Sequence, residues 1–160
     1  MLLFLLGSLN VWADQVSFAW SGTQDGKTKA ITWTSDVCTM VQEQNSNNAT
    51  APNSSYISAP RWYANNKITI TAGSGVATFT SIVITATSNS YATALAKSTY
   101  TRTGGTGSVS ASASGTAVTI TCTGTVTAFT IVMGGQSRLS SSTTPIINYT
   151  PFGGSPQPTV

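Results

Sequence analysis

Hydrophobic and polar residues alternate in short runs along most of this chain. Val, Ile, Thr, Phe, Tyr and Trp fill the runs, and Gly, Asn, Asp and Ser separate them, as in strands that have one buried and one solvated face. Only residues 91–98 suit one or two turns of helix. The pattern predicts strands at 15–20, 29–34, 37–42, 56–63, 67–72, 79–87, 108–113, 117–123, 128–133 and 146–150.

The spacing of these strands predicts an all-β fold, specifically an antiparallel two-sheet β-sandwich that is jelly-roll-like. Successive side chains of a strand point to opposite faces, so the alternation also predicts which residues face the core. Trp20 is expected to be buried with them. The residues expected to face inward are Ile31, Trp33, Ile68, Ile70, Ile82, Ile84, Val118, Ile120, Phe129 and Ile131.

Several polar or glycine-containing segments are expected to be turns or loops. Asp25-Gly26 lies between two expected strands, and this pair suits a hairpin turn because both residues tolerate positive φ. The glycines at 73–75 and 104–107 also predict turns. The segment 43–55 is rich in Asn and Ser and has no apolar anchor in this interpretation, so we expect an exposed, mobile loop.

Both ends of the chain differ in composition from the alternating part. Residues 1–13 contain an apolar run and a small-residue site, which predicts a secretory signal peptide; a buried first strand is the alternative. Residues 14–150 form the predicted β-sandwich domain. Residues 151–160 are rich in Gly, Pro and Ser, so we interpret them as a linker to a further C-terminal domain.

Charged residues make up only 7% of the chain, and Ser, Thr, Asn and Gly supply most of its polarity. A surface that follows nucleic-acid phosphates needs a dense basic stripe, so we expect no nucleic-acid partner. We also expect no membrane span once the signal is removed. The net charge of +3 comes from scattered basic residues, namely Lys27, Lys29, Arg61, Lys67, Lys97, Arg102 and Arg138.

Four motifs occur in order along most of the chain. Residues 58–63 read SAPRWY, 66–70 read NKITI, 79–84 read FTSIVI and 146–149 read IINY. In content and order these motifs resemble a domain that recurs in secreted and cell-surface proteins of Bacteroidetes such as Prevotella and Bacteroides. The resemblance implies a β-sandwich of unassigned function, often placed near the N-terminal side of multidomain extracellular proteins.

The side chains that usually carry catalysis are scarce. The chain has no His, which removes the commonest general base and metal ligand. Its carboxylates are Asp14, Asp25, Asp36 and Glu43, and no two of them suggest the rigid pair that a glycosidase requires. We therefore expect a non-enzymatic protein without a cofactor or a metal site.

The two cysteines, Cys38 and Cys122, leave two alternatives open. In an oxidising compartment they could form a disulfide that closes a long loop and contributes about 4 kcal/mol. Alternation places Cys122 on the apolar side of its strand, so buried free thiols are the other alternative. Neither cysteine belongs to a C-x-x-C motif, so a redox-active site is not indicated.

A group of polar and aromatic residues near one predicted strand end is the candidate ligand-binding site. Arg61, Trp62, Tyr63, Asn65 and Asn66 offer a cation, two rings and two amides, a mixture that suits a neutral polysaccharide. Because Trp62 and Tyr63 point to opposite faces of a strand, only one ring can belong to the platform. We expect Trp62 to be buried and Tyr63 to contact the ligand.

Together these observations favour a non-catalytic extracellular accessory module of a larger secreted protein, with a polysaccharide or cell-surface glycan as its partner. One alternative is a structural spacer or adhesin-type domain. Another is an N-terminal appendage of a secreted enzyme whose catalytic domain lies beyond residue 160. Exposed aromatic rings would favour the first hypothesis, and a featureless Ser/Thr surface the second.

Overall fold

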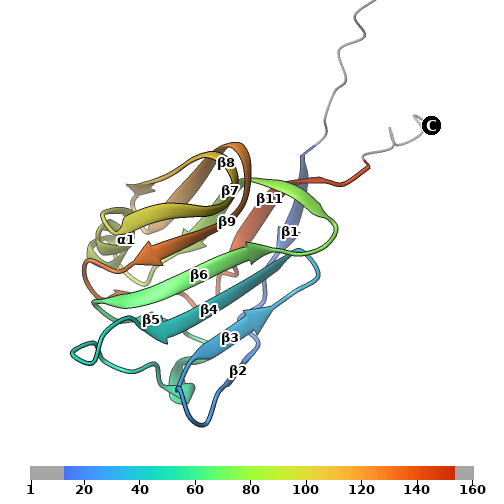
Figure 1. The fold of residues 1–160 in the computed structure, drawn as a ribbon. Helices are drawn as coiled ribbons and strands as arrows, with labels where there is room; N and C mark the ends of the chain where they lie inside the picture. The colour runs from blue at the N-terminus through green and yellow to red at the C-terminus, as the bar shows by residue number, and fades with distance from the viewer. Residues whose placement is uncertain (1–12, 154–160) are drawn as a thin grey trace, which may run out of the picture.

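The computed structural model describes residues 13–153 and consists mainly of antiparallel strands with one short helix (Figure 1). The predicted all-β antiparallel class is therefore confirmed. The helix α1 spans Asn89–Ala96, and a 3-10 turn, η1, spans Ser54–Tyr56. The strands are β1 (Asp14–Ser17), β2 (Gly22–Gln24), β3 (Ile31–Thr34), β4 (Cys38–Gln44), β5 (Arg61–Trp62), β6 (Asn66–Ala72), β7 (Val76–Thr85), β8 (Thr99–Ser114), β9 (Ala117–Val132), β10 (Ser137–Arg138) and β11 (Ile146–Pro151).

The main sheet has nine strands, in the order β1-β11-β7-β9-β6-β4-β3-β2, with β8 paired to β9. On one edge, β9 pairs with β7 through residues 117–121 and with β6 through residues 128–132. The sheet therefore curls around β9 into a half-barrel (Figure 1). The second sheet contains only β5 and β10. A two-sheet, jelly-roll-like sandwich is not confirmed, because one continuous sheet carries most of the strands.

Glycines in the middle of the β8–β9 hairpin permit this curl. The pairing register between the two strands shifts on both sides of Gly104, which marks a β-bulge. Gly105, Gly107 and Gly124 have φ angles of 74°, 101° and 92°, a region that residues with a side chain rarely adopt. The turn predicted at 104–107 is therefore wrong. These residues bend a continuous strand, and the hairpin turn lies further along, between β8 and β9.

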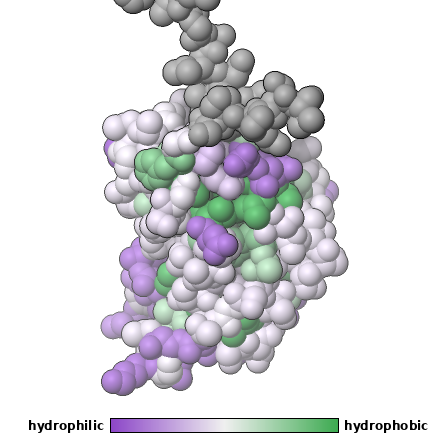
Figure 2. Space-filling model, turned by 90° about the vertical axis from the view of Figure 1, so that its right-hand side faces the viewer, coloured by the Kyte–Doolittle hydropathy of each residue, from purple (hydrophilic) through white to green (hydrophobic). Residues whose placement is uncertain are grey.

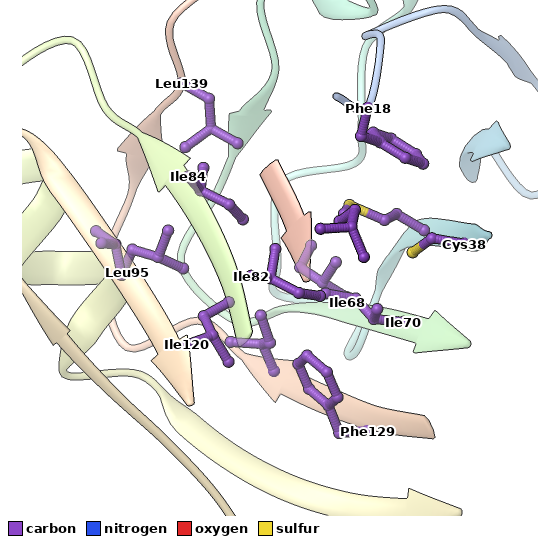
Figure 3. Packing of buried hydrophobic residues seen from close by; sticks show 14 of the residues in the cluster. Phe18, Cys38, Ile68, Ile70, Ile82, Ile84, Leu95, Ile120, Phe129 and Leu139 are labelled. Atoms are coloured by element: carbon purple, nitrogen blue, oxygen red, sulfur yellow. The ribbon is translucent and has the colours of Figure 1, made fainter. Parts of the chain in front are cut away.

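The predicted core is confirmed. Every residue that alternation assigned to the inside is buried, with exposed fractions of 0 or 1%. Figure 3 shows side chains such as Ile68, Ile82 and Phe129, from β6, β7 and β9, meeting in this core. Each fully buried side chain of this size contributes about 1.5–3 kcal/mol to folding. The alternating pattern therefore identifies both the strands and the face that each one buries.

An aromatic cluster connects the N-terminal strands to β5. The ring of Trp20 lies edge-to-face against Phe18, Trp33 and Trp62, with centroid distances of 5.8, 5.5 and 6.2 Å. Trp20 is 8% exposed and Trp33 is fully buried, so the expected burial of both is confirmed. The indole Nε1 of Trp33 donates a hydrogen bond to the Ile57 carbonyl oxygen at 2.8 Å. This bond fastens the segment before β5 to the core.

Two local assignments need adjustment. The strand predicted at 56–63 is mostly irregular, because Asn53 caps η1 by accepting a hydrogen bond from Ser55 N at 2.9 Å, and only β5 remains as strand. The helix predicted at 91–98 is present as α1 but begins two residues earlier. It starts after Ser88, whose hydroxyl accepts from the Tyr91 backbone N–H.

The polar loop after β4 is anchored, so the expectation that it has no apolar anchor is wrong. Ala49 is 6% exposed and Pro52 is also buried. The Gln24 side chain donates to the Pro52 carbonyl oxygen at 2.8 Å. Residues 45–48 between β4 and this anchor are exposed, as expected.

The predicted turn at Asp25-Gly26 connects β2 and β3. The Asp25 carboxylate accepts hydrogen bonds from Lys27 N at 2.9 Å and from the backbone N–H and the hydroxyl of Thr28. The positive φ falls on Lys29 at 62°, and not on the Asp-Gly pair as the sequence suggested. The carboxylate therefore organises this turn.

The two ends of the chain are only partly described. The predicted signal peptide lies outside the described residues apart from Ala13, as does the linker from residue 154 onward. β11 includes Pro151, which pairs with Val76, and Phe152 N donates to the Gly75 carbonyl oxygen at 3.0 Å. The hydrogen-bonded structure thus continues into the first residues of the predicted linker.

Candidate ligand-binding site

The candidate site begins on the small sheet formed by β5 and β10 and continues into the turn between β5 and β6. Arg61 pairs with Arg138, and Trp62 pairs with Ser137. The two faces of this sheet differ sharply. Trp62 and Ser137 are fully buried, whereas both arginines are partly exposed. The inner face belongs to the core, and the outer face is available to a ligand.

Trp62 is buried, as the sequence analysis expected. Its ring contacts Trp20 edge-to-face, and its exposed fraction is 0%. Among the described residues its indole N–H has no hydrogen-bond partner. This side chain therefore supports the site from the core side and does not reach a surface ligand.

Asn66 is also buried, with an exposed fraction of 0%. Its side-chain oxygen accepts from Gln42 Nε2 at 2.6 Å and from Tyr63 N at 3.3 Å. Its amide nitrogen donates to the Thr50 carbonyl oxygen at 2.8 Å. These bonds satisfy the amide and join β4, β6 and the loop after β4. The predicted ligand-binding residue Asn66 thus has a structural role in this geometry.

Tyr63 and Asn65 remain at the surface. They belong to a turn in which Asn66 N donates to the Tyr63 carbonyl oxygen at 3.0 Å. Asn65 has a φ of 61° and is exposed, while Tyr63 is half-buried. Asn is one of the few residues that tolerate this conformation, which explains its place in the turn. Of the five predicted site residues, the structure leaves Arg61, Tyr63 and Asn65 accessible.

Two further arginine–tyrosine contacts extend the site beyond the predicted residues. The Arg61 guanidinium carbon lies 3.8 Å from the ring centroid of Tyr56, in η1. The Arg138 guanidinium carbon lies 5.4 Å from the centroid of Tyr91, in α1. Both distances are in the range of cation–π contacts. Sequence reasoning missed Arg138 because β10 has only two residues and shows no period.

Two of the four carboxylates, those of Asp25 and Glu43, have partners elsewhere in the chain. Hydrogen bonds from the Thr28 backbone, the Thr28 hydroxyl and the Lys27 backbone lower the pKa of Asp25 in its turn. Glu43 forms an ion pair with Lys67. Residues 13–153 contain no group of three or more His, Cys, Asp or Glu side chains able to hold a metal, and no helix long and apolar enough to cross a membrane.

The surface offers few other features that suggest a ligand. The face in Figure 2 is mostly pale, because residues of intermediate hydropathy cover much of it; strongly hydrophilic residues form small separate groups, and hydrophobic residues, in green, gather in its upper half. One open hollow of about 200 Å³ lies along β2 and β3. It presents hydroxyls but no ring or charge, so it is a weaker candidate than the outer face of β5 and β10. Its lining residues are Ser21, Gly22, Thr23, Thr32 and Thr34.

Both cysteine side chains are free and buried in the structure, which corresponds to the second of the two alternatives above. Burial raises the pKa of Cys38 to about 12 and that of Cys122 to about 11. The thiolate is the reactive form, and these raised pKa values keep both thiols protonated near neutral pH. Neither cysteine is therefore suited to act as a nucleophile.

We expect neither thiol to react with DTNB at pH 8 while the protein is folded, and both to react after denaturation. The Cys122→Ala variant should then release the signal of one thiol under denaturing conditions. The purified protein is assayed without reductant, and its intact mass is measured in parallel. A mass lower by two hydrogens, with no reactive thiol after denaturation, would establish a disulfide between Cys38 and Cys122 instead.

Comparisons of the chain with protein-family models, with curated proteins and with solved structures found no match. The resemblance of the sequence motifs to a Bacteroidetes domain stays a prediction. Arguments about function therefore rest on the residues and geometry of the chain itself.

Proposed function

We propose that this chain is a non-catalytic, extracellular accessory module that binds a glycan on the outer face of β5. The observation that carries the proposal is the position of Tyr63. Its ring is half-buried at the surface, two residues after an arginine that lies 3.8 Å above a second tyrosine ring, that of Tyr56.

The chemistry of this surface suits a sugar. The C–H face of a sugar ring stacks on an aromatic ring, and polar groups beside it bind hydroxyls. The Arg61 guanidinium and the exposed Asn65 amide can supply these hydrogen bonds. Trp62 supports β5 from the buried side, so the outer side chains start from a rigid strand.

Secretion and a multidomain context complete the proposal. The apolar leader at 1–13 favours export, and the Gly/Pro-rich composition of 151–160 favours a linker to another domain. An accessory module of a secreted enzyme is compatible with the same organisation. The resemblance to the Bacteroidetes domain implies a β-sandwich. For this chain, that finer fold assignment is a proposal about the curled sheet.

A structural spacer or adhesin-type domain is the second candidate function. The observation that favours it is β8, a long edge strand whose residues are mostly exposed and are mainly Ser, Thr, Gly and Ala. Its one charged residue, Arg102, folds back and donates to the carbonyl oxygens of Gly105 and Gly107. The β-bulge at Gly104 and the positive φ angles beside it bend this edge, which disfavours pairing with a strand of another molecule.

We expect Tyr63→Ala to weaken glycan binding by about five- to tenfold, because the variant loses one stacked ring. Tyr63→Phe keeps the ring and should retain most of the affinity. Binding is measured by calorimetric titration of the wild type and both variants with a panel of plant and host polysaccharides. The wild-type dissociation constant should lie between about micromolar and millimolar.

Two outcomes would contradict this function. Absence of binding to every glycan of the panel at millimolar concentration would favour the spacer. Equal affinities of the wild type and Tyr63→Ala would show that Tyr63 does not contact the glycan. Circular dichroism spectra of the variants that match the wild type are the control for folding.

A further inference from the structure

The side chains of Arg61 and Arg138 leave the same face of the β5–β10 sheet, next to each other. The two residues are opposite in the antiparallel register. The hydrogen bond from Leu139 N to the Pro60 carbonyl oxygen, 2.8 Å long, lies just outside this pair. The pair is therefore of the non-hydrogen-bonded type, in which the Cβ atoms are about 4.5–5.5 Å apart.

Aromatic rings flank this arginine pair on both sides. Tyr56 comes from η1, next to β5, and Tyr91 comes from α1, which contacts β10. Each ring makes a cation–π contact with one guanidinium, and the two arginines are neighbours in the sheet. The four side chains therefore form a row in the order Tyr56, Arg61, Arg138, Tyr91. We call this row the arginine–tyrosine row. Stacking limits the freedom of both guanidinium groups before any ligand arrives.

Within residues 13–153, no ion pair joins either positive charge of the row to an acidic side chain. Like charges directly opposite each other in a sheet are unfavourable. All four acidic residues of the sequence lie within residues 13–153, and the ion pair found there joins Glu43 to Lys67 and involves neither arginine of the row. Within the same part of the chain, the buried Nε of Arg138 has no hydrogen-bond partner. An anion placed between the two arginines would relieve this repulsion.

We infer that Arg61 and Arg138 together bind a carboxylate or sulfate group of an acidic glycan. This inference rests on the proposed glycan-binding function and specifies its ligand class. A guanidinium donates two parallel hydrogen bonds to a carboxylate or sulfate, which a single ammonium does not do. The flanking rings suit the sugar that carries the group. A polynucleotide is disfavoured, because the other basic residues are scattered along the chain.

The test compares polymers that differ only in charge. Polygalacturonate is titrated against its fully methyl-esterified form, and dextran sulfate against dextran, so that the carboxylate and sulfate sources are separated. We expect the acidic form of at least one pair to bind the wild type about tenfold more tightly than its neutral counterpart. Arg61→Gln and Arg138→Gln should each remove most of this difference between the acidic and the neutral form.

Two further variants separate a specific site from general attraction of polyanions. Lys27→Gln removes one positive charge from an exposed turn and should change the affinity by less than about twofold. Arg61→Lys keeps the charge but not the planar fork, so it should bind the acidic form more weakly than the wild type. It also tests the site if a glutamine variant fails to fold.

The outcomes also distinguish this inference from the broader function. Equal binding of acidic and neutral polymers would overturn the inference and leave glycan binding intact. A loss of affinity in Lys27→Gln as large as in the arginine variants, or equally tight binding of a single-stranded oligonucleotide, would overturn it too. A third outcome is that acidic polymers bind, that the arginine variants weaken this binding and that Tyr63→Ala does not. This result would support the inference and show that Tyr63 is not part of the binding site. No binding to any polymer would overturn both.

Discussion

Gly105→Ala is expected to prevent the chain from reaching a stable native state. Gly105 has a φ of 74°, and a Cβ atom built there would overlap the Thr125 carbonyl oxygen of the paired strand. The substitution therefore combines an unfavourable backbone conformation with a clash against backbone that cannot rotate away. Together these effects should cost about 3–5 kcal/mol, a large part of the stability of a domain of this size. Urea unfolding followed by tryptophan fluorescence measures the loss.

Two other glycines separate the causes of this effect. Gly115 has a φ of 60° but open space around its Cβ position, so Gly115→Ala should cost only about 1 kcal/mol. Gly26 has open space and no positive φ, and Gly26→Ala should be nearly neutral. If Gly105→Ala unfolded at the same urea concentration as Gly26→Ala, the bend in the β8–β9 hairpin would not be needed for the fold.

Alternation identified the core well because burial imposes it directly. In β9, Val118 and Ile120 are buried while Thr119 between them is more exposed, and the sequence pattern matches this burial pattern. The same holds for Ile68 and Ile70 in β6. Which side chains of a strand face the core can therefore be predicted from the sequence of that strand alone.

The curl of the sheet was not predictable from the same pattern. Glycines at 104–107 resemble a turn, because a turn and a strongly bent strand both require positive φ. The pairing of β8 with β9 on both sides of these glycines shows that the bend lies inside a long hairpin, and the pairing of β9 with both β6 and β7 shows the curl. This pairing joins residues that are distant in sequence. The jelly-roll-like interpretation rested on the spacing of strands and turns, and that spacing counted the glycines inside β8 as a turn.

The candidate site was predictable in part for the same reason. Arg61 and Tyr63 stand out locally as a cation and a ring beside polar residues. Arg138 and Tyr91 belong to the same surface only because β10 pairs with β5 and α1 lies against β10. The sequence pattern predicts neither the pairing of β10 with β5 nor the packing of α1 against β10, because a strand of two residues is too short to show a period. The inaccessibility of Asn66 likewise depends on hydrogen bonds to other elements.

The aromatic cluster makes the outer surface dependent on the core beneath it. Trp62 connects the outer surface to the aromatic cluster, since its backbone belongs to β5 and its ring contacts Trp20. Trp33 also contacts Trp20 and holds the Ile57 carbonyl, close in sequence to Tyr56. Removing a ring from this cluster should therefore disturb both stability and the arginine–tyrosine row.

Trp33→Ala is expected to destabilise the protein by about 3–5 kcal/mol and to leave little folded material. The ring is fully buried, so its removal creates a cavity in the aromatic cluster. The hydrogen bond from Nε1 to the Ile57 carbonyl oxygen, 2.8 Å long, is lost as well, which leaves a buried acceptor unpaired. Trp33→Phe keeps much of the ring but not the donor, and should cost about half as much. Chemical denaturation curves and near-UV circular dichroism of both variants measure these losses. An unchanged unfolding midpoint for Trp33→Ala would show that β3 does not bury this ring, and that the inward register of β3 and β4 is wrong.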